Sequence, residues 1–365
     1  MSVINKISGG INEFKALPAK DKKRRISDMF FNNAMYIIIV IAVIYIAIRV
    51  PAFLSVSSIV NIVSLTAAKL PIALGVAGAI VLTGTDISAG RMVGLAACIV
   101  ASLVQTTSKL FPNGTIFSNM PIGVVIPIAL LIVMVACGAI GFVNGFFVAK
   151  FKLHPFIVTL STQLITYGLI LMYMMMGTNN GQTLSNLNPT YLDFVRGTLF
   201  SVPGPNGSTV AVPRYVLYAA ILVVIMWFVW NKTKFGKNMF AVGSNEEAAN
   251  VSGVNVFMTI VCVFILAGVM YAITGFFEGA RIASCSANTG LNYESDAIAA
   301  CVIGGVSFVG GTGKISGIVL GVFVLRIIFV ALNMLGIDPN LQFIIKGGII
   351  LAACSLDMRK YLVRK

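Results

Sequence analysis

The segment Gly304–Gly317, GGVSFVGGTGKISG, is the first place where residue spacing could indicate chemistry. Glycine-rich loops can cradle phosphates, and the nucleotide-binding version requires the pattern G-x-x-x-x-G-K-[ST]. Around Gly313 and Lys314, Phe308 stands where the first glycine is needed and Ile315 stands where the hydroxyl residue is needed. The pattern fails twice, so this segment predicts a tight turn between two close-packed helices and no ATP site.

Hydrolytic and metal chemistry have little support in the sequence. The one histidine, His154, precedes Pro155 and is interpreted as a turn residue. Six cysteines are scattered through apolar runs without a C-x-x-C pair, and they are interpreted as small core residues: Cys98, Cys137, Cys262, Cys285, Cys301 and Cys354. We therefore do not expect an ordinary enzyme.

Polar side chains within apolar runs are better candidates for function, because they are costly in a membrane and tend to face cavities. Uncharged groups of this kind suit a neutral, hydroxyl-rich solute such as a sugar. Interhelical hydrogen bonding is an equally open interpretation for each of them. The candidates for a translocation path are Asn144, Thr159, Thr162, Gln163, Asn333 and Gln342.

A polar and basic segment, Asn231–Val256, interrupts the apolar chain. Within it, Ser244 and Glu247 have the S-x-x-E spacing of a capping box. We expect a helix over residues 245–252, ended by Gly253 in a left-handed cap. The helix would be either a solvated piece of a loop or a rigid docking element with an apolar patch formed by Ala248, Ala249 and Val251.

Composition decides the class of protein. The chain has 365 residues, of which 58% are hydrophobic and 10% are charged, whereas about 25% charged residues is usual for soluble chains. We therefore expect an integral membrane protein. The net charge of +14 comes from residues in tails and loops beside apolar runs, a pattern typical of membrane topology and not of nucleic-acid binding.

Ten apolar runs must position these residues, in one transmembrane domain over residues 34–358 between basic tails at 1–33 and 359–365. A straight helix needs about 20 residues to cross a membrane, so shorter runs predict tilted, broken or partly buried helices. The runs are Ala34–Val50, Ile59–Thr83, Ala89–Gln105, Pro121–Ala149, Phe156–Met176, Arg214–Trp230, Phe257–Phe277, Ala297–Val309, Ile315–Gly336 and Leu341–Leu356.

Charge distribution predicts the orientation of the spans. With an internal N-terminus, 17 Lys and Arg residues fall in the segments expected in the cytoplasm and 5 fall in the outer segments. Basic residues concentrate on the cytoplasmic side of membrane proteins. We therefore expect both termini and the segment 231–256 to be cytoplasmic.

Several stretches resemble a known family. Glu247-Ala248-Ala249 followed by Gly253 resembles the cytoplasmic EAA loop of bacterial ABC importer permeases, although the downstream I-x-L-P is replaced by Val254-Asn255-Val256-Phe257. That departure is similar to the ribose/galactoside/xylose permease family. The stretches GVAGAIVLTGTDISAGRMVGLAA, GFVNGFFVAKFKLHPFIVTL and DAIAACVIGGVSFVGGTGKISG also resemble this family, within it most of all the galactose/methyl-galactoside importers.

The resemblance implies an all-α integral membrane fold of about ten helices, like the permeases of type II importers, in the bacterial inner membrane. It implies a homodimer, a cytoplasmic subunit that binds ATP-Mg, and a periplasmic or lipid-anchored sugar-binding protein. This chain would need no cofactor, would contact lipid and no nucleic acid, and would carry galactose or methyl galactoside. The implied ATPase-docking, or coupling, residues are Ser244, Asn245, Glu246, Glu247, Ala248, Ala249 and Gly253.

An ion-coupled secondary sugar transporter is the main alternative, and an anchoring protein is a third. A secondary transporter is expected to have a carboxylate deep in the membrane. The sequence offers only Asp86, Glu278 and Asp296, which lie near the predicted ends of spans.

Overall fold

The computed structural model describes residue 18 and residues 44–362, except 109, 113–116, 118 and 205–207, and it gives no side-chain description for 353 and 356–362. Apart from residue 18, the basic tail predicted at 1–33 and most of the first apolar run lie outside the described residues. The described chain begins with helical residues 44–49 and a 3₁₀ turn, η1(Pro51–Leu54).

Within the described residues, six helices are long and apolar enough to cross a membrane. Their main-chain groups bond within each helix, which is what a lipid environment requires. The chain is therefore a multi-pass membrane protein. The six are α3(Val56–Val81), α5(Ile122–Phe151), α6(Pro155–Met174), α8(Tyr215–Lys232), α11(Val256–Ile282) and α13(Ile315–Met334).

Other apolar runs form shorter or less apolar helices, so the predicted ten spans stay a prediction. They include α4(Ala89–Val104), α12(Tyr293–Ile303) and α14(Pro339–Leu362). With 11 residues, α12 extends only about 16 Å at 1.5 Å per residue. That is less than the roughly 30 Å of a hydrocarbon core. The eighth predicted run therefore does not cross as one straight helix.

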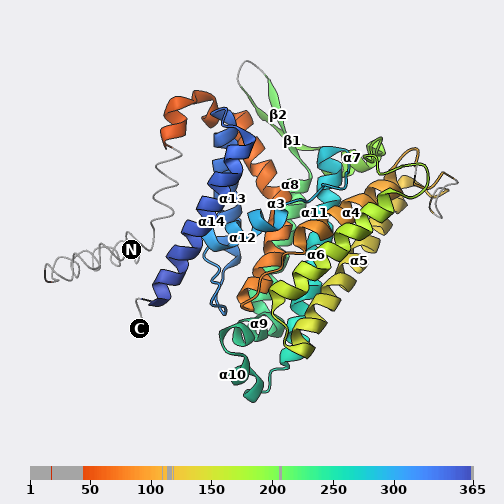
Figure 1. Cartoon of the computed structure of the whole chain (residues 1–365). Coiled ribbons are helices and arrows are strands. Elements are labelled where there is room, and N and C mark those ends of the chain that lie inside the picture. The colour runs from red at the N-terminus through yellow and green to blue at the C-terminus, as the bar shows by residue number, and fades with distance from the viewer. Residues whose placement is uncertain are drawn as a thin grey trace.

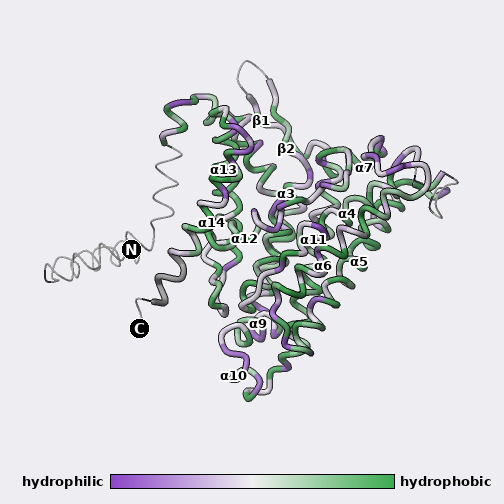
Figure 2. The backbone as a smooth tube through the Cα atoms, in the orientation of Figure 1, coloured by the Kyte–Doolittle hydropathy of each residue, from purple (hydrophilic) through white to green (hydrophobic). Residues whose placement is uncertain are grey.

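Helices α3 and α11 form the centre of the bundle (Figure 1). Two thirds of the apolar window of each helix is buried inside the protein, against about a quarter for α6 and α8. Apolar residues run along nearly the whole length of the long helices (Figure 2). The outer helices therefore present their apolar faces to lipid, while α11 packs on α3, α4 and α5.

The α5–α11 contact is a close approach of two helix backbones at small residues. A Cβ added at Gly141 or Gly145 would overlap the α11 backbone at Phe264 or Val261, and one at Gly268 would overlap Cys137 of α5. Small residues let helix backbones approach closely in membranes. Helix α3 continues through Pro71 without a break.

The all-α prediction missed a short hairpin. Strand β1(Thr198–Pro203) pairs antiparallel with β2(Thr209–Pro213), with Ser201 opposite Ala211. These strands are rich in Thr, Val and Phe, which favour extended structure. The hairpin and the short helix α7(Pro189–Arg196) lie at the end of the bundle opposite α9(Lys234–Ser244) and α10(Glu246–Val251) (Figure 1).

Candidate functional site

The polar segment between α8 and α11 forms two helices, α9(Lys234–Ser244) and α10(Glu246–Val251). The sequence predicted only the second. The missed helix α9 begins with a side-chain cap, since the hydroxyl of Thr233 accepts a hydrogen bond from the Gly236 N–H at 3.2 Å. Both helices lie at one extremity of the molecule (Figure 1).

Asn245, and not Ser244, caps the start of α10. The Oδ1 atom of Asn245 accepts a hydrogen bond from the Ala248 N–H at 2.8 Å. Ser244 is the last residue of α9, whereas Asn245 has the extended backbone (φ −163°, ψ 109°) that an N-cap needs. The predicted capping box of Ser244 and Glu247 is therefore wrong, because α9 continues to Ser244.

The end of α10 confirms the left-handed glycine. Gly253 has φ +82°, its N–H donates to the Asn250 carbonyl at 3.0 Å, and the Val254 N–H donates to the Ala249 carbonyl at 3.0 Å. This pair of hydrogen bonds forms the Schellman motif. No atom lies within 4 Å of a Cβ added at Gly253, so the backbone conformation and not the space requires glycine.

The two alanines of α10 lie in opposite environments. Ala249 is 4% exposed and packs in an apolar cluster with Val148, Ala149 and Val256. Ala248 is exposed, and Val251 is 90% exposed. The predicted three-residue patch is therefore wrong in one member, because Ala249 attaches the helix to the bundle and only the other two face outward.

The acidic residues of α10 lie beside a groove of about 610 Å³ between this helix and the ends of α5 and α11. Glu246 forms an ion pair with Lys152, the residue that follows α5. Glu247 is exposed. The groove is lined by Ala149, Lys152, Glu246, Glu247, Asn250, Gly253, Val254, Asn255, Val256 and Phe257.

Two predicted path residues meet at the connection between α3 and α4. Asn144 donates from Nδ2 to the Ser88 hydroxyl at 3.1 Å. The Thr159 hydroxyl accepts from the Ile87 N–H at 3.2 Å and donates to the Thr85 carbonyl at 3.2 Å. Both side chains are fully buried.

The same connection contains a buried carboxylate. Asp86 is 1% exposed. Its Oδ1 atom accepts from the Ser88 hydroxyl at 2.6 Å, and its Oδ2 atom accepts from the Tyr271 hydroxyl at 3.0 Å. Together with Asn144, these groups form a polar network that joins the 85–88 segment to α5 and α11.

The remaining predicted path residues do not join this network. The Thr162 hydroxyl donates to carbonyls of its own helix, and Gln163 is partly exposed. Asn333 and Gln342 pair with each other at 2.8 Å, at the turn between α13 and α14. The structure therefore does not bring the six residues together into one lining.

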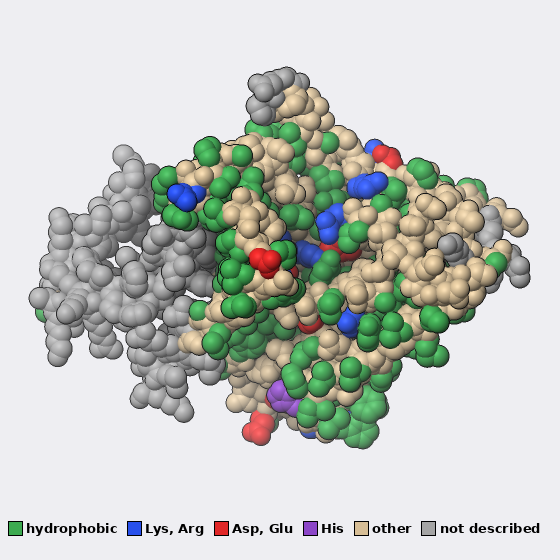
Figure 3. Space-filling view, turned by 45° about the horizontal axis from the view of Figure 1, so that its top comes forward, with side chains coloured by type: hydrophobic (Ala, Val, Ile, Leu, Met, Phe, Trp, Pro, Cys, Tyr) green, Lys and Arg blue, Asp and Glu red, His purple; other side chains and the backbone are tan. Residues whose placement is uncertain are grey.

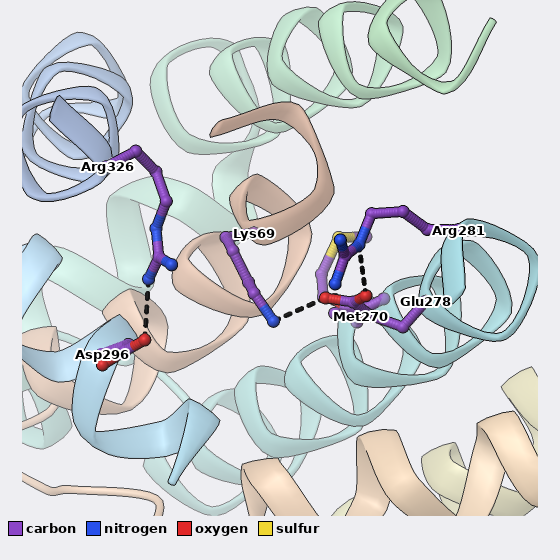
Figure 4. Close-up of polar contacts among 7 residues, drawn as sticks. Lys69, Met270, Glu278, Arg281, Asp296 and Arg326 are labelled. Carbon is purple, nitrogen blue, oxygen red and sulfur yellow. Dashed lines mark hydrogen bonds and ion pairs between the residues drawn. The ribbon is translucent and has the colours of Figure 1, made fainter. Parts of the chain in front are cut away.

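A buried ion-pair cluster on α3 and α11 was missed by the sequence analysis. Lys69 Nζ lies 2.5 Å from Glu278 Oε1, and Arg281 Nε lies 2.6 Å from Glu278 Oε2 (Figure 4). The Lys69 ammonium also lies 2.8 Å from the centre of the Tyr293 ring of α12. The available signal was Lys69 itself, because it is the one charged residue within the apolar run of α3.

A second ion-pair cluster links α12, α13 and α14. Asp296 lies 2.7 Å from Arg326 Nη2 and 3.1 Å from Lys346 Nζ, and the close-up shows the Arg326 pair (Figure 4). Viewed toward the hairpin end, Lys, Arg, Asp and Glu side chains gather near the middle of the face (Figure 3). Glu278 and Asp296, although near helix ends in sequence, are thus each bound by two cationic groups.

Comparison with known proteins identifies the family of the chain. Residues 58–354 match the family described as the permease component of the branched-chain amino acid transport system. The chain belongs to this family. No solved structure matches it.

Individual members of the permease family are similar over nearly their whole length. The galactose/methyl galactoside import permease of Salmonella typhimurium is 43% identical over 346 residues, covering 91% of this chain and 96% of the relative. Its counterpart in Haemophilus influenzae is 40% identical over 94% of this chain and 99% of the relative. The ribose import permease of Bacillus subtilis is 32% identical, covering 88% of this chain and 90% of the relative.

Proposed function

We propose that the chain is the membrane-spanning permease subunit of an ATP-driven sugar importer, with galactose or methyl galactoside as substrate. Two copies would form the transmembrane unit in the bacterial inner membrane. A separate cytoplasmic subunit would bind and hydrolyse ATP-Mg, and a periplasmic or lipid-anchored protein would deliver the sugar. The proposed substrate is supported by relatives at 40–43% identity that are galactose/methyl galactoside import permeases.

The observation that carries the proposal is the construction of α10. The helix is capped at both ends, by Asn245 and by the Gly253 turn, so its short backbone is held rigid. One face is attached to the bundle through Ala249, while Ala248 and Val251 are exposed beyond the spans. A rigid, anchored helix with an outward apolar face suits the transmission of a push from an ATPase subunit.

We propose that α10 faces the cytoplasm, since Lys and Arg residues concentrate on that side of the predicted topology. The hairpin end then faces outward, toward the sugar-binding protein. In alternating access, the outer helices would move against the buried pair α3 and α11.

For the sugar route, Asn144 is the strongest of the predicted residues. Within the described part of the chain, its buried Oδ1 atom has no hydrogen-bond partner, and such a group normally acquires one. A sugar hydroxyl could donate to it when the helices separate. Thr159, on α6, hydrogen-bonds to the same α3–α4 connection, whereas Asn333 and Gln342 are hydrogen-bonded to each other.

A pair of arginine substitutions tests the docking role of α10. Ala248→Arg places a large cation on the exposed face, so the permease should fold normally but should lose the co-purifying ATPase subunit and most uptake of labelled galactose. A loss of 1.4 kcal/mol in docking would weaken the complex about tenfold. Ala249→Arg should instead disrupt the packing of α10 on the apolar cluster of Val148, Ala149 and Val256 and lower the melting temperature.

Ala248→Ser is the matched control, because it keeps the exposed site small. It should retain the ATPase subunit and uptake. Normal co-purification and uptake by the Ala248→Arg protein would contradict docking at this helix.

The ion-coupled alternative is tested separately with proteoliposomes that contain the permease, the ATPase subunit and the sugar-binding protein. Uptake should require enclosed ATP and should persist when ionophores abolish proton and sodium gradients. Uptake that needs a proton or sodium gradient and no ATP would establish a secondary transporter. The ion pairs of Glu278 and Asp296 with cationic side chains support the ATP-driven mechanism. Asp86, by contrast, is held by the Ser88 and Tyr271 hydroxyls and is the carboxylate that this test examines.

A further inference from the structure

Two cysteines that are far apart in sequence meet in the protein interior. The sulfur atoms of Cys98, on α4, and Cys285, which follows α11, lie 2.9 Å apart. That is less than 1 Å longer than the bond of a disulfide, ~2.05 Å. Their exposed fractions are 0% and 1%.

The surrounding backbone brings the two sulfurs together. Gly90, Gly94 and Cys98 follow one another at intervals of four residues, so they share one face of α4. A Cβ added at Gly90 would overlap the carbonyl oxygen of Gly290, and one at Gly94 would overlap that of Thr289. The loop after α11 therefore packs closely against α4 at Gly90 and Gly94. Cys98, on the same face of α4, contacts the loop at Cys285.

Cys285 is also fixed on its other side. Its N–H donates to the Leu184 carbonyl at 2.9 Å, and its carbonyl accepts from the Leu184 N–H at 2.8 Å. These reciprocal bonds form an antiparallel bridge. The main chain at Cys285 is thus held between the 184 segment and α4, with its sulfur directed at Cys98.

The other fully buried cysteines have different surroundings. The thiol of Cys137 donates to the Met92 carbonyl at 3.6 Å, and that of Cys301 donates to the Ala73 carbonyl at 3.2 Å. These two residues provide controls of equal burial.

The thiol pair lies toward the end of the bundle opposite α10. Helix α11 has 27 residues, or about 40 Å at 1.5 Å per residue. It runs from Val256, beside α10, to Ile282, just before Cys285. With α10 in the cytoplasm, Cys285 belongs to the outer end, where disulfides form and persist.

We propose that Cys98 and Cys285 form a disulfide in the cell, which fixes the loop after α11 to α4. The inference rests on the orientation given under the proposed function. A pair facing the cytoplasm would be kept reduced.

The oxidation proceeds by thiol–disulfide exchange with an extracytoplasmic protein that carries an oxidising disulfide. Before the loop after α11 packs on α4 and buries both thiols, one cysteine loses its proton and attacks that disulfide to form a mixed disulfide, which releases one thiol of the oxidant. The second cysteine loses its proton and attacks the sulfur of the first. This permease gains one S–S bond, and the oxidant leaves as a dithiol carrying the two electrons and two protons.

The test is mass spectrometry of the full chain from acid-quenched cells, alkylated under denaturing conditions without reductant. We expect a linked peptide pair that contains Cys98 and Cys285 and weighs two hydrogens less than the separate peptides. Cys137→Ser and Cys301→Ser should keep this link. Cys98→Ser should abolish it and leave Cys285 alkylated. Alkylation of both Cys98 and Cys285 in the unsubstituted chain would overturn the proposal.

A second measurement does not depend on the serine variants. Reduction should lower the melting temperature of the unsubstituted chain and leave that of the Cys98→Ala/Cys285→Ala double variant unchanged. Equal effects of reductant on both proteins would contradict the link. Neither readout needs transport, so alkylated thiols with normal ATP-driven uptake reject the disulfide alone. Linked thiols without galactose uptake reject the proposed function alone.

Discussion

The ion pair at α10 and the ion pair in the bundle centre join the same residue types in opposite surroundings. Lys152 and Glu246 have side chains 63% and 45% exposed, whereas those of Lys69 and Glu278 are 9% and 0% exposed. Exposed pairs contribute about 0–1 kcal/mol to stability. Breaking a buried pair costs about 3–5 kcal/mol, because a charge is left without a partner.

The comparison shows that the bundle centre and α10 are held in place by different interactions. In the centre, Glu278 of α11 fixes α3 through Lys69, and the Lys69 ammonium lies over Tyr293 of α12. At the other end, α10 depends on its caps and on the apolar seat of Ala249. Ion pairs therefore hold the interior helices together, whereas apolar packing and hydrogen bonds to the main chain position α10.

The largest expected effect is that of Glu278→Gln. This change keeps the size of the side chain but leaves Lys69 and Arg281 without their carboxylate. We expect the free energy of unfolding to fall by about 3–5 kcal/mol, whereas its typical value is about 5–15 kcal/mol. The measurement is the amount of monodisperse protein recovered in detergent and its melting temperature.

Glu247→Gln is the control for Glu278→Gln, since Glu247 is exposed on α10. It should melt like the unsubstituted chain. If both variants melt alike, burial does not distinguish the two regions.

Asp296→Asn should have the next largest effect. It removes the carboxylate shared by Arg326 and Lys346, whose side chains are 11% and 25% exposed. Because water reaches these cations in part, we expect a loss of about 1.5–3 kcal/mol, the range for a hydrogen bond to a charged group. Thermal unfolding in detergent measures it.

Asp193→Asn is the matched surface substitution for Asp296→Asn. The Asp193 side chain is 65% exposed and pairs with Arg214. Its removal should leave the melting temperature nearly unchanged. A larger effect at Asp193 than at Asp296 would reverse the comparison.

Helix positions could be predicted from the sequence because a membrane requires long apolar runs. Helices α5, α11 and α13 follow the predicted runs closely. The left-handed turn at Gly253 was also predictable, since the choice of residue is local. The number of spans was less predictable, because the run Ala297–Val309 is already too short for a straight span and its length does not decide whether it crosses the membrane.

The charged interior could not be predicted from local patterns. Lys69 and Glu278 are 209 residues apart, and Asp296 and Arg326 come from different helices. Their pairing depends on which helix faces meet. The N-cap of α10 was misassigned for a related reason, because α9 was not anticipated and its end at Ser244 makes Asn245 the cap.

A smaller effect is expected from removing the cap of α10. Asn245→Ala deletes the acceptor of the Ala248 N–H and should cost about 0.5–2 kcal/mol of local helix stability. The measurement is hydrogen exchange of the α10 amides, which should become faster while exchange in α11 is unchanged. Ser244→Ala is the control and should leave exchange in α10 nearly unaltered. Faster exchange in Ser244→Ala than in Asn245→Ala would restore the capping box.

The smallest effect is expected from Lys152→Met, which removes the exposed ion pair with Glu246 and keeps the length of the side chain. The charges are screened by water and salt, and ordering two long side chains offsets part of their attraction. We expect a change of about 0–1 kcal/mol, and any difference from the unsubstituted chain should disappear as salt is raised. Melting curves at low and high salt measure it. A salt-independent loss as large as that of Glu278→Gln would mean that α10 is also locked by charge.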